Sequence, residues 1–460
     1  MKLLSEKLEN RQATAAVIGL GYVGLPLAME IASAGFKVIG LDLDRTKIAT
    51  LKQGKSYILD VSDKIVAETT QSGRFTPTTD FSALSNADTV SICVPTPLSK
   101  SRDPDISFIL AATAEIRKYL HTNQLIVLES TTYPGTTDEL ILPELESSGL
   151  RVGKDFFLAF SPERIDPGNA SFNTKNTPKI VGGTTAECTE IARTFYGQFI
   201  EHVIPVSSTK CAEMVKLLEN TFRSVNIGMV NEMALMCDLL GVDIYEVIDA
   251  AATKPFGFIP FYPGPGLGGH CIPIDPHYLA WKLKALNFQA RFIGLASEIN
   301  GMMPSVVTSL VAEGLNRASR SIRGSKVLIL GVAYKKNVSD CRESPALDVM
   351  RMLSDKGALL SYNDPFVPTV RLGGQMLAST GLSAGEIESQ DCVIILTDHS
   401  DYDFRSILKS ARLVIDTRNA TKDLPEFKDR IIKLGAGNNL ASSLPHDDGH
   451  DVSTTSLATH

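Results

Sequence analysis

The sequence lacks the features that would direct it to a membrane or to nucleic acid. None of its 460 residues falls in an apolar run approaching the ~20 residues of a membrane helix, and residues 1–13 are too polar for a signal peptide. It also lacks a long basic run, and its net charge is −7, so nothing favours nucleic acid or an anionic membrane surface. We therefore expect a cytoplasmic protein with neither kind of partner.

Cysteine is scarce and follows no metal-binding or disulfide pattern. The seven cysteines are an odd number without a Cys-x-x-Cys pair, so we predict no metal and no disulfide framework. One of them, Cys271, lies in a run rich in glycine and proline, residues 264–275, that cannot form an ordinary helix or strand. Such a loop could present the thiol of Cys271 to a substrate as a nucleophile. The alternative interpretation is that Cys271 is a small, buried apolar residue.

The N-terminal region predicts a dinucleotide-binding unit. A predicted strand, residues 15–18, leads into Gly19-Leu20-Gly21-Tyr22-Val23-Gly24, and a helix over 25–33 and a strand over 37–41 follow. In this motif the first glycine turns the chain, the second admits the pyrophosphate and the third lets helix and strand pack. Asp42, about twenty residues on, would accept the ribose hydroxyls and favours NAD over NADP, although Arg45 nearby leaves NADP open.

The remaining pattern predicts a fold of class α/β. Strands over 89–94, 125–128, 157–160 and 179–181 would continue a mostly parallel sheet. A second sheet would begin at 326–331 and continue with strands over 358–362, 393–396 and 413–416. We predict two Rossmann-like doubly wound parallel sheets joined by a long central helix. Helical runs are expected over 208–240, 244–252, 278–286, 297–318 and 346–355. Only Gly331 of a second glycine fingerprint is present, so we assign no second dinucleotide.

Several motifs, in order along residues 14–435, resemble the UDP-glucose/GDP-mannose dehydrogenase family. They are Gly19 to Gly24, Val94 to Pro97, Ser130-Thr131, Ser161-Pro162-Glu163, Lys216 with Asn220, Gly268 to Cys271 with Asp275, and Tyr334-Lys335 with Arg342 to Pro345. The resemblance implies an NAD-binding domain (1–206), a central helical dimerisation domain with the cysteine loop (207–318) and a C-terminal UDP-sugar-binding domain (319–440). We expect a homodimer and a disordered tail over 441–460.

The resemblance also implies that the C6 alcohol of a nucleotide sugar is oxidised to a carboxylate. Two hydride transfers are needed, and a thiolate can hold the intermediate aldehyde as a thiohemiacetal that then becomes a thioester. Cys271 is the candidate nucleophile, and since a thiol of pKa ~8.5 is mostly protonated at neutral pH, it needs a cationic neighbour. Lys216 and Asn220, four apart on a predicted helix, could both reach an oxyanion at C6, unless they are a solvated lysine and a surface amide.

Three further residues would complete the catalysis. The family counterpart of Glu163 is credited as the base of thioester hydrolysis. Asp275 would orient the water or organise Cys271 and Lys216, with a helix N-cap as the alternative. Thr131 could bond the same water, or be a turn residue.

The binding residues form two predicted sets. The cofactor set is Gly19, Gly21, Tyr22, Val23, Gly24, Asp42, Arg45, Pro95, Thr96, Thr131 and Arg342. The substrate set is Glu163, Arg164, Lys216, Asn220, Gly268, His270 and Lys335. Arg342 suits pyrophosphate, although a surface pair with Glu343 or Asp340 is the alternative. We interpret His270 as a substrate contact or a structural residue, because adjacent residues usually point apart.

The choice of sugar depends on the segment after Glu163. UDP-glucose members carry a second glutamate four positions on, where this chain has Pro167, and the motif instead resembles the branch acting on UDP-N-acetylhexosamines. We favour UDP-GlcNAc or UDP-GalNAc, for surface polysaccharide synthesis, with UDP-ManNAc close behind and UDP-glucose as a further alternative. A single-hydride β-hydroxyacid dehydrogenase would need neither the cysteine loop nor the second sheet, and a non-catalytic relative would be expected to lose the thiol.

Overall fold

The computed structural model describes residues 1–58, 60–99, 103–166, 171–269 and 271–437. Packing divides the chain into two units, Met1–Ser224 with His270–Gly294, and Val225–Gly269 with Leu295–His460. The long helices α8 (Thr209–Leu240) and α11 (Arg291–Arg317) each contribute to both units. These packing units have other bounds than the three domains predicted above, which stay a prediction. His270 and the predicted tail lie outside the described residues.

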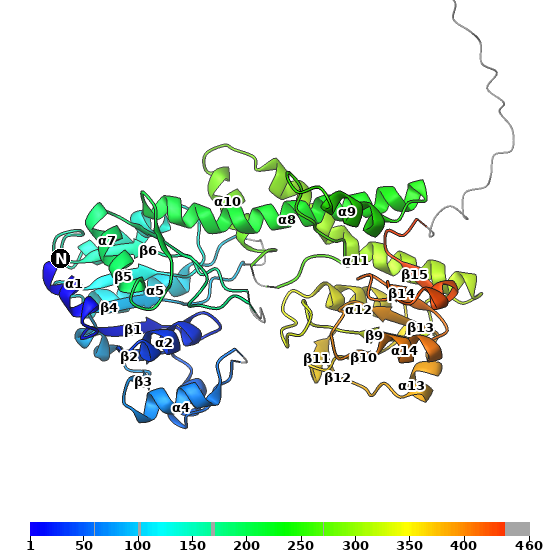
Figure 1. Ribbon diagram of the computed structural model, residues 1–460, viewed down its shortest axis with the longest axis horizontal. Helices are drawn as coiled ribbons and strands as arrows, with labels where there is room; N and C mark the ends of the chain where they lie inside the picture. Colours follow the sequence, from blue (N-terminus) through cyan, green and yellow to red (C-terminus); the bar gives the residue numbers. More distant parts are fainter. Residues whose placement is uncertain (59, 100–102, 167–170, 270, 438–460) are drawn as a thin grey trace, which may run out of the picture. The chain divides into compact units, whose positions relative to one another are not determined.

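The first unit is built on an eight-stranded sheet (Figure 1, blue to green). Its strands, in spatial order, are β3 (Phe75–Thr78), β2 (Lys37–Leu41), β1 (Thr14–Ile18), β4 (Thr89–Ile92), β5 (Leu125–Leu128), β6 (Phe157–Phe160), β7 (Lys179–Gly183) and β8 (Val203–Pro205). Neighbours are parallel except β6 and β7, which pair antiparallel through Ala159 with Gly183 and Phe160 with Gly182. A parallel neighbour needs a crossover, usually a helix, and the described residues between β6 and β7 contain none.

Both faces of this sheet are buried along its central strands β4, β5 and β6, and successive side chains of a strand enter opposite faces. On β1, Ala15 and Val17 enter one core, and Ala16 and Ile18 enter the other. Burial on both faces explains why the strands read as nearly continuous apolar runs. The first core is covered by α1 (Lys2–Glu9), α2 (Gly24–Ser33), α3 (Arg45–Lys52), α4 (Asp63–Gln71) and α7 (Ala186–Tyr196), and the second by α5 (Ser107–Tyr119), η2 (Thr137–Ile141) and α6 (Leu142–Glu146).

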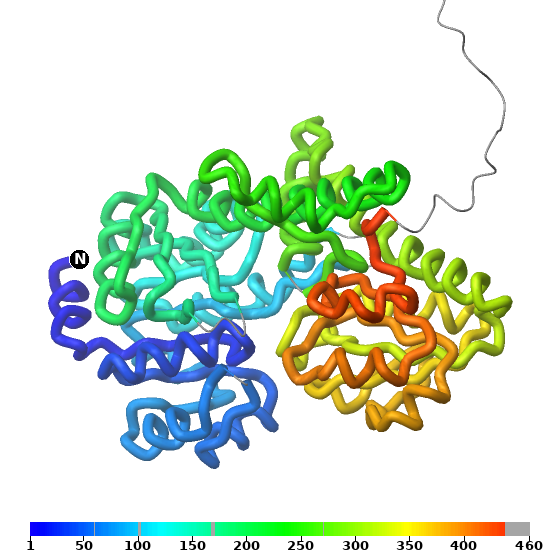
Figure 2. Tube along the Cα trace, turned by 45° about the vertical axis from the view of Figure 1, so that its right-hand side comes forward, coloured from blue at the N-terminus to red at the C-terminus, as the bar shows by residue number. Residues whose placement is uncertain are grey.

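The second unit contains a five-stranded parallel sheet, which Figure 2 follows in yellow to red. Its order is β10 (Leu359–Asn363), β9 (Lys326–Leu330), β13 (Cys392–Ile395), β14 (Val414–Asp416) and β15 (Ile431–Lys433). Helices α11 and α12 (Pro345–Asp355) contribute to one of its cores, and α13 (Ala384–Glu388) and α14 (Phe404–Ser410) to the other. A hairpin, β11 (Thr369–Leu372) with β12 (Gln375–Ala378), and α9 (Ile244–Ala252) complete this unit. The predicted fold class is thus confirmed, while β3, β8, β15 and the hairpin were not predicted.

The strand order places a ligand edge on each sheet. It reverses between β1 and β4 in the first sheet and between β9 and β13 in the second. Open α/β sheets bind ligands beyond the carboxyl ends of the strands at such a reversal. Within the described chain, no helix is both long and apolar enough to cross a membrane.

Candidate active site at the carboxyl edge of the first sheet

The glycine loop after β1 is shaped for a close ligand. Gly19 has φ +90°, and a Cβ there would lie 2.4 Å from the carbonyl oxygen of Cys93 after β4. A Cβ on Gly24 would lie 1.8 Å from the carbonyl oxygen of Gly19, so this glycine allows α2 to pack on the loop. A Cβ on Gly21 would meet nothing within 4 Å, so the backbone is open where the motif admits a pyrophosphate. The loop therefore fits a dinucleotide.

Asp42, at the end of β2, is anchored beside this loop. One carboxylate oxygen accepts from the Leu20 amide at 2.9 Å and pairs with Lys47 Nζ at 3.1 Å. A carboxylate oxygen has further acceptor capacity, so the ribose hydroxyls can still bind here. Lys47 on α3, which was not predicted, is the cation beside Asp42, whereas the predicted Arg45 is exposed at the start of the same helix.

Four side chains, Lys216, Asn220, Arg223 and Asp275, interact where α8 passes the start of α10 (Asp275–Lys284). Asn220 donates its side-chain amide to the carboxylate of Asp275 and accepts from the guanidinium of Arg223. Lys216, one turn before Asn220, attracts the charge of Asp275. Burial raises the pKa of Asp275 to about 6, against the opposing effects of Lys216, Asn220 and Arg223. The predicted shared face of Lys216 and Asn220 is thus present and buried.

The structure changes the interpretation of Asp275 as a helix N-cap. Helix α10 begins at Asp275 itself, three residues earlier than expected, and its N-cap is Ile274, which forms no side-chain cap bond. The carboxylate of Asp275 instead accepts from α8. The N-cap alternative was therefore wrong.

Cys271 lies one turn before α10, four residues before Asp275 in the chain. Its carbonyl oxygen accepts from the amides of Ile274 and Asp275, at 3.0 and 2.8 Å. The side chain is partly exposed, and all seven cysteines, each in the described part of the chain, are thiols. The two hydrogen bonds to its carbonyl oxygen tie the backbone of Cys271 to the start of α10.

The ammonium of Lys216 is buried near Glu163 and Asp275 without a direct contact to either carboxylate. Lys216 is only 8% exposed, yet among the described residues it forms neither an ion pair nor a hydrogen bond. It acts on both Glu163 and Asp275 through their charges, and each of these carboxylates has its shorter contacts elsewhere. A buried cation is costly unless it is paired, so this ammonium is ready to receive an anionic or oxyanionic ligand.

Glu163 follows β6 in a rigid and heavily hydrogen-bonded setting. One of its oxygens accepts from the amides of Arg164 and Ile165 at 2.7 and 2.8 Å, and the other contacts Lys179 Nζ at 3.2 Å. Burial opposes its charge, but Lys179, the two amides and Lys216 outweigh burial and lower the pKa of Glu163. The cluster thus holds one carboxylate that stays ionised and one, Asp275, that titrates near pH 6.

The other predicted residues of this edge lie in loops after the strands. Thr131 is half-buried after β5, and its hydroxyl has no hydrogen-bond partner within the described ranges. The carbonyl oxygen of Thr96, after β4, accepts a hydrogen bond from the hydroxyl of Tyr278 on α10 at 2.8 Å. The guanidinium of Arg164 is engaged within the protein, where it donates to Glu219 at 2.6 Å and to the carbonyl oxygen of Pro178 at 2.7 Å.

Three predicted residues belong to the second unit. A Cβ on Gly268 would lie 2.7 Å from the side chain of Tyr334, so the glycine lets this loop pack beside the start of the 334–345 segment. Lys335 is half-buried in that segment. The guanidinium of Arg342 contacts Asp340 at 2.7 and 3.0 Å, which is the surface pair given as the alternative. Their roles toward substrate and cofactor stay predictions.

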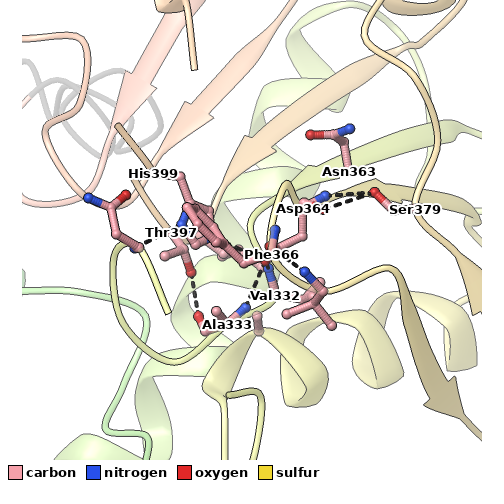
Figure 3. A network of polar contacts seen from close by, with 12 residues as sticks. Val332, Ala333, Asn363, Asp364, Phe366, Ser379, Thr397 and His399 are labelled. Atoms are coloured by element: carbon pink, nitrogen blue, oxygen red, sulfur yellow. Dashed lines mark hydrogen bonds and ion pairs between the residues drawn. The ribbon is translucent and has the colours of Figure 1, made fainter. Parts of the chain in front are cut away.

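A network of polar contacts lies at the reversal point of the second sheet (Figure 3). Asp364, after β10, accepts from the amides of Val332 and Ala333 at 2.7 and 3.0 Å, as Asp42 accepts from Leu20 in the first sheet. Nε2 of His399 lies 3.1 Å from Oδ2 of Asp364, and Nδ1 of His399 accepts from the Asn337 amide. Asp364 is buried, whereas Asp42 in the first sheet is partly exposed.

Sequence reasoning missed three residues that structure this site, Lys47, Lys179 and Arg223. It also missed Asp364 at the edge of the second sheet. Lys179 begins a buried strand, where a lysine that is 4% exposed is unusual. That signal was available in the sequence, because a charged residue next to an apolar run predicts either an exposed strand end or a buried ion pair. Its partners, Glu129 and Glu163, follow other strands and could not be identified without the sheet order.

Comparisons with known proteins identify the family of this chain. Residues 13–200 match the NAD-binding domain of the UDP-glucose/GDP-mannose dehydrogenase family, residues 210–302 its central domain and residues 328–423 its UDP-binding domain. The chain is 35% identical to the UDP-N-acetyl-D-glucosamine 6-dehydrogenase of Pseudomonas aeruginosa over 354 residues, covering 76% of this chain and 82% of that protein. It is 34% identical to the NDP-N-acetyl-D-galactosaminuronic acid dehydrogenase of Ralstonia nicotianae, with 88% and 95% covered.

A solved structure extends the likeness to the whole fold. The UDP-D-ManNAc dehydrogenase of Pyrococcus horikoshii superposes with a TM-score of 0.84 at 34% identity, covering 92% of this chain and 99% of that one. The predicted resemblance and the predicted cofactor, NAD, are thereby confirmed. The chain therefore belongs to the UDP-glucose/GDP-mannose dehydrogenase family and is an NAD-dependent nucleotide-sugar dehydrogenase.

Proposed function

We propose that the protein oxidises the C6 alcohol of a UDP-N-acetylhexosamine to the uronate through a thioester on Cys271. The observation that carries this proposal is the buried ammonium of Lys216, with no partner among the described residues and with Asn220 and Asp275 beside it. An ammonium and an amide on one helix face can stabilise the oxygen at C6 when it carries negative charge. Cys271, one turn before α10, supplies the thiol that a two-stage oxidation requires.

The proposed reaction balances as two oxidations followed by a hydrolysis. One alcohol, two NAD⁺ and one water give one carboxylate, two NADH and three protons. NAD supplies the hydride acceptor in each oxidation and would be held by the open loop at Gly21 and by Asp42. Between the oxidations the sulfur of Cys271 adds to the aldehyde carbon, so the aldehyde cannot leave as a free hydrate.

In the oxidations, Lys216 and Asn220 bind the C6 oxygen as its proton leaves. Asp275 ties this pair to the cysteine turn, since its side chain accepts from Asn220 and its amide donates to the carbonyl oxygen of Cys271. Its carboxylate is ionised above about pH 6, where it offsets the charge of Lys216.

In the hydrolysis, water attacks the thioester carbon, the new C–O bond forms, and the C–S bond breaks to return the thiolate of Cys271. Glu163 accepts the proton of this water in the proposal, and the hydroxyl of Thr131 can bond the same water. Because Glu163 is anchored by two amides and Lys179, its carboxylate is fixed and unprotonated before the water arrives.

For the substrate we propose UDP-GlcNAc or UDP-GalNAc, with UDP-ManNAc next. The three relatives above are named for N-acetyl-D-glucosamine, N-acetyl-D-galactosaminuronic acid and D-ManNAc. Their identities to this chain, 34–35%, do not separate the sugars. The Pro167 position, which removes the second glutamate expected in UDP-glucose members, supports an N-acetylated sugar. We place the enzyme in the cytoplasm, as a homodimer that serves surface polysaccharide synthesis.

The testing experiment measures the NADH formed when a limiting UDP-sugar is exhausted. UDP-GlcNAc, UDP-GalNAc, UDP-ManNAc and UDP-glucose are compared, with Cys271→Ser as the control variant. Two NADH per sugar, lost in Cys271→Ser, would establish the thioester route and name the substrate. One NADH per sugar would indicate a simple alcohol dehydrogenase, and no NADH with any sugar would overturn the proposal.

A further inference from the structure

A buried lysine joins two carboxylates behind the candidate active site. Lys179 Nζ lies 2.6 Å from Glu129, after β5, and 3.2 Å from Glu163, after β6. All three residues are at most 8% exposed. The hydroxyl of Tyr196 donates to the other oxygen of Glu129 at 2.6 Å, and Lys179 Nζ lies 5.3 Å from the centre of the Tyr196 ring.

We propose that Lys179, anchored by Glu129, is a positioning residue that fixes the carboxylate of Glu163 for the hydrolytic release of the product. The proposal rests on the proposed function, in which Glu163 faces the attacking water. Lys179 acts only by holding Glu163 and does not itself contact the reacting atoms.

The contact between Lys179 and Glu163 is not needed to neutralise Glu129 within the sheet. Glu129 has two partners of its own, Lys179 and Tyr196, and would be satisfied without Glu163. Lys179 nevertheless reaches the one oxygen of Glu163 that the loop amides leave open, because those amides both bind the other oxygen. The carboxylate is therefore held at both ends, and it cannot rotate without losing a charged contact.

The groups that act on Glu163 come from several elements. They are Lys179 on β7, Lys216 on α8 and the amides of Arg164 and Ile165 in its own loop. Glu129, after β5, and Cys93, after β4, act on Lys179. Of the two lysines, Lys179 has the larger effect and the direct contact. Removing Lys179 should therefore leave Glu163 both looser and easier to protonate.

The experiment uses a charge-matched double variant, Lys179→Met/Glu129→Gln. In the parent, one lysine and two glutamates sum to a charge of −1, and the double variant keeps −1 on Glu163 alone. This avoids leaving Glu129 as an uncompensated buried charge, as the single variant would. Lys179→Arg tests rescue, Glu163→Gln gives the reference phenotype, and Glu213→Gln changes a buried carboxylate of α8 that binds Gly135 and Thr137 instead.

With the UDP-sugar that the parent oxidises, rapid-mixing kinetics separate NADH formation from product release. We expect Glu163→Gln to keep a burst of two NADH per active site and then turn over at least about 100-fold more slowly, the usual contribution of a general base. The double variant should keep the same burst and then turn over at least about tenfold more slowly, because the base is present but less well positioned. Intact-mass measurement should show the sugar covalently held on the enzyme, and lost when Cys271 is replaced. Lys179→Arg and Glu213→Gln should turn over within about threefold of the parent.

A merely structural role would give another pattern. Equal loss of burst amplitude and steady-state rate, without covalent sugar on the enzyme, would overturn the proposal, as would turnover by the double variant at the parent rate. If the parent oxidises no UDP-sugar, the proposed function fails on that observation alone.

A titration without substrate tests the Lys179–Glu163 contact independently. Infrared difference spectra between each protein and its Glu163→Gln derivative report the protonation of Glu163. We expect protonation at higher pH in the double variant than in the parent. Identical titrations would overturn the inference even if the enzyme is active.

Discussion

The glycines of the loop after β1 differ in what a side chain would meet. Gly21 has open space around its missing Cβ, whereas a Cβ on Gly24 would collide with the backbone of Gly19. We therefore predict that Gly21→Ala keeps the unfolding free energy of the parent but weakens NAD binding about tenfold or more, because the pyrophosphate must approach this backbone. Isothermal titration with NAD, together with urea unfolding, measures both quantities.

Gly24→Ala serves as the opposite case in the same loop. We expect it to lower the unfolding free energy by about 1–3 kcal/mol, the usual cost of overpacking, and to weaken NAD binding as a consequence of the distorted loop. A Gly21→Ala protein that unfolds as easily as Gly24→Ala would show that the loop has no open face for a ligand.

Asp275 makes a prediction about pH. Its raised pKa of about 6 means that the carboxylate is protonated below pH 6 and ionised above it. Since the proposed chemistry uses the ionised form beside Lys216, kcat should rise with pH through about 6 and level off above it. In Asp275→Asn we expect a residual rate at least about 100-fold lower and without this rise.

The pH–rate profile of Asp275→Asn needs a control for the integrity of the protein. Because asparagine keeps an oxygen that can accept from Asn220, the variant should remain folded, as measured by circular dichroism, and should still bind NAD. An unchanged acid limb in Asp275→Asn would assign that limb to another group.

At the scale of the element, the loop after β9 depends on one carboxylate. Asp364 accepts from the amides of Val332 and Ala333, and on its other oxygen from those of Phe366 and Val367 at 2.8 and 3.0 Å. Asp364→Ala leaves these donors buried without an acceptor, so we expect a loss of about 3 kcal/mol or more of unfolding free energy, while Asp364→Asn should lose less. Urea unfolding of both variants tests this.

The same carboxylate has a predicted pH dependence. Burial opposes its ionisation, but His399 and the backbone amides outweigh burial and lower the pKa of Asp364. Its stabilising effect is thus complete above its unfolded pKa of about 3.9 and is lost as pH falls through the lower folded value. The difference in stability between the parent and Asp364→Asn should narrow below about pH 4, and a constant difference would contradict the assignment.

Helices were predictable as elements because their apolar periodicity is local. The sequence predicted 208–240 for α8, and the structure has Thr209–Leu240. The start of α10 was misplaced by three residues, because Pro276 can occupy the first turn of a helix as readily as precede one. The antiparallel β7 could not be predicted either, since strand direction depends on pairing and not on composition.

At the scale of the whole molecule, an exposed apolar stripe on α8 bears on the predicted homodimer. Seven exposed residues recur there at helical spacing: Met214, Leu218, Phe222, Met229, Met233, Met236 and Leu240. We expect the parent to sediment as a dimer, and Met236→Glu/Leu240→Glu to shift it toward monomer, because two charges would be buried in the interface. Leu359→Glu, a change at an exposed residue of β10, is the matched control. A monomeric parent would contradict the prediction.

The sequence by itself determined the glycine loop, Asp42, the two α/β sheets and the Lys216–Asn220 face. The glycine loop and the Lys216–Asn220 face depend on residues close together in the chain, and the sheets were inferred from the local pattern of each strand and helix. Only the tertiary structure decided that Lys179 connects Glu129 with Glu163, that Asp275 binds α8 and titrates near pH 6, and that Asp364 contacts His399 at the second sheet edge. These contacts join residues 16 to 55 positions apart in the chain, and burial, which sets their energies, exists only once the sheets have formed.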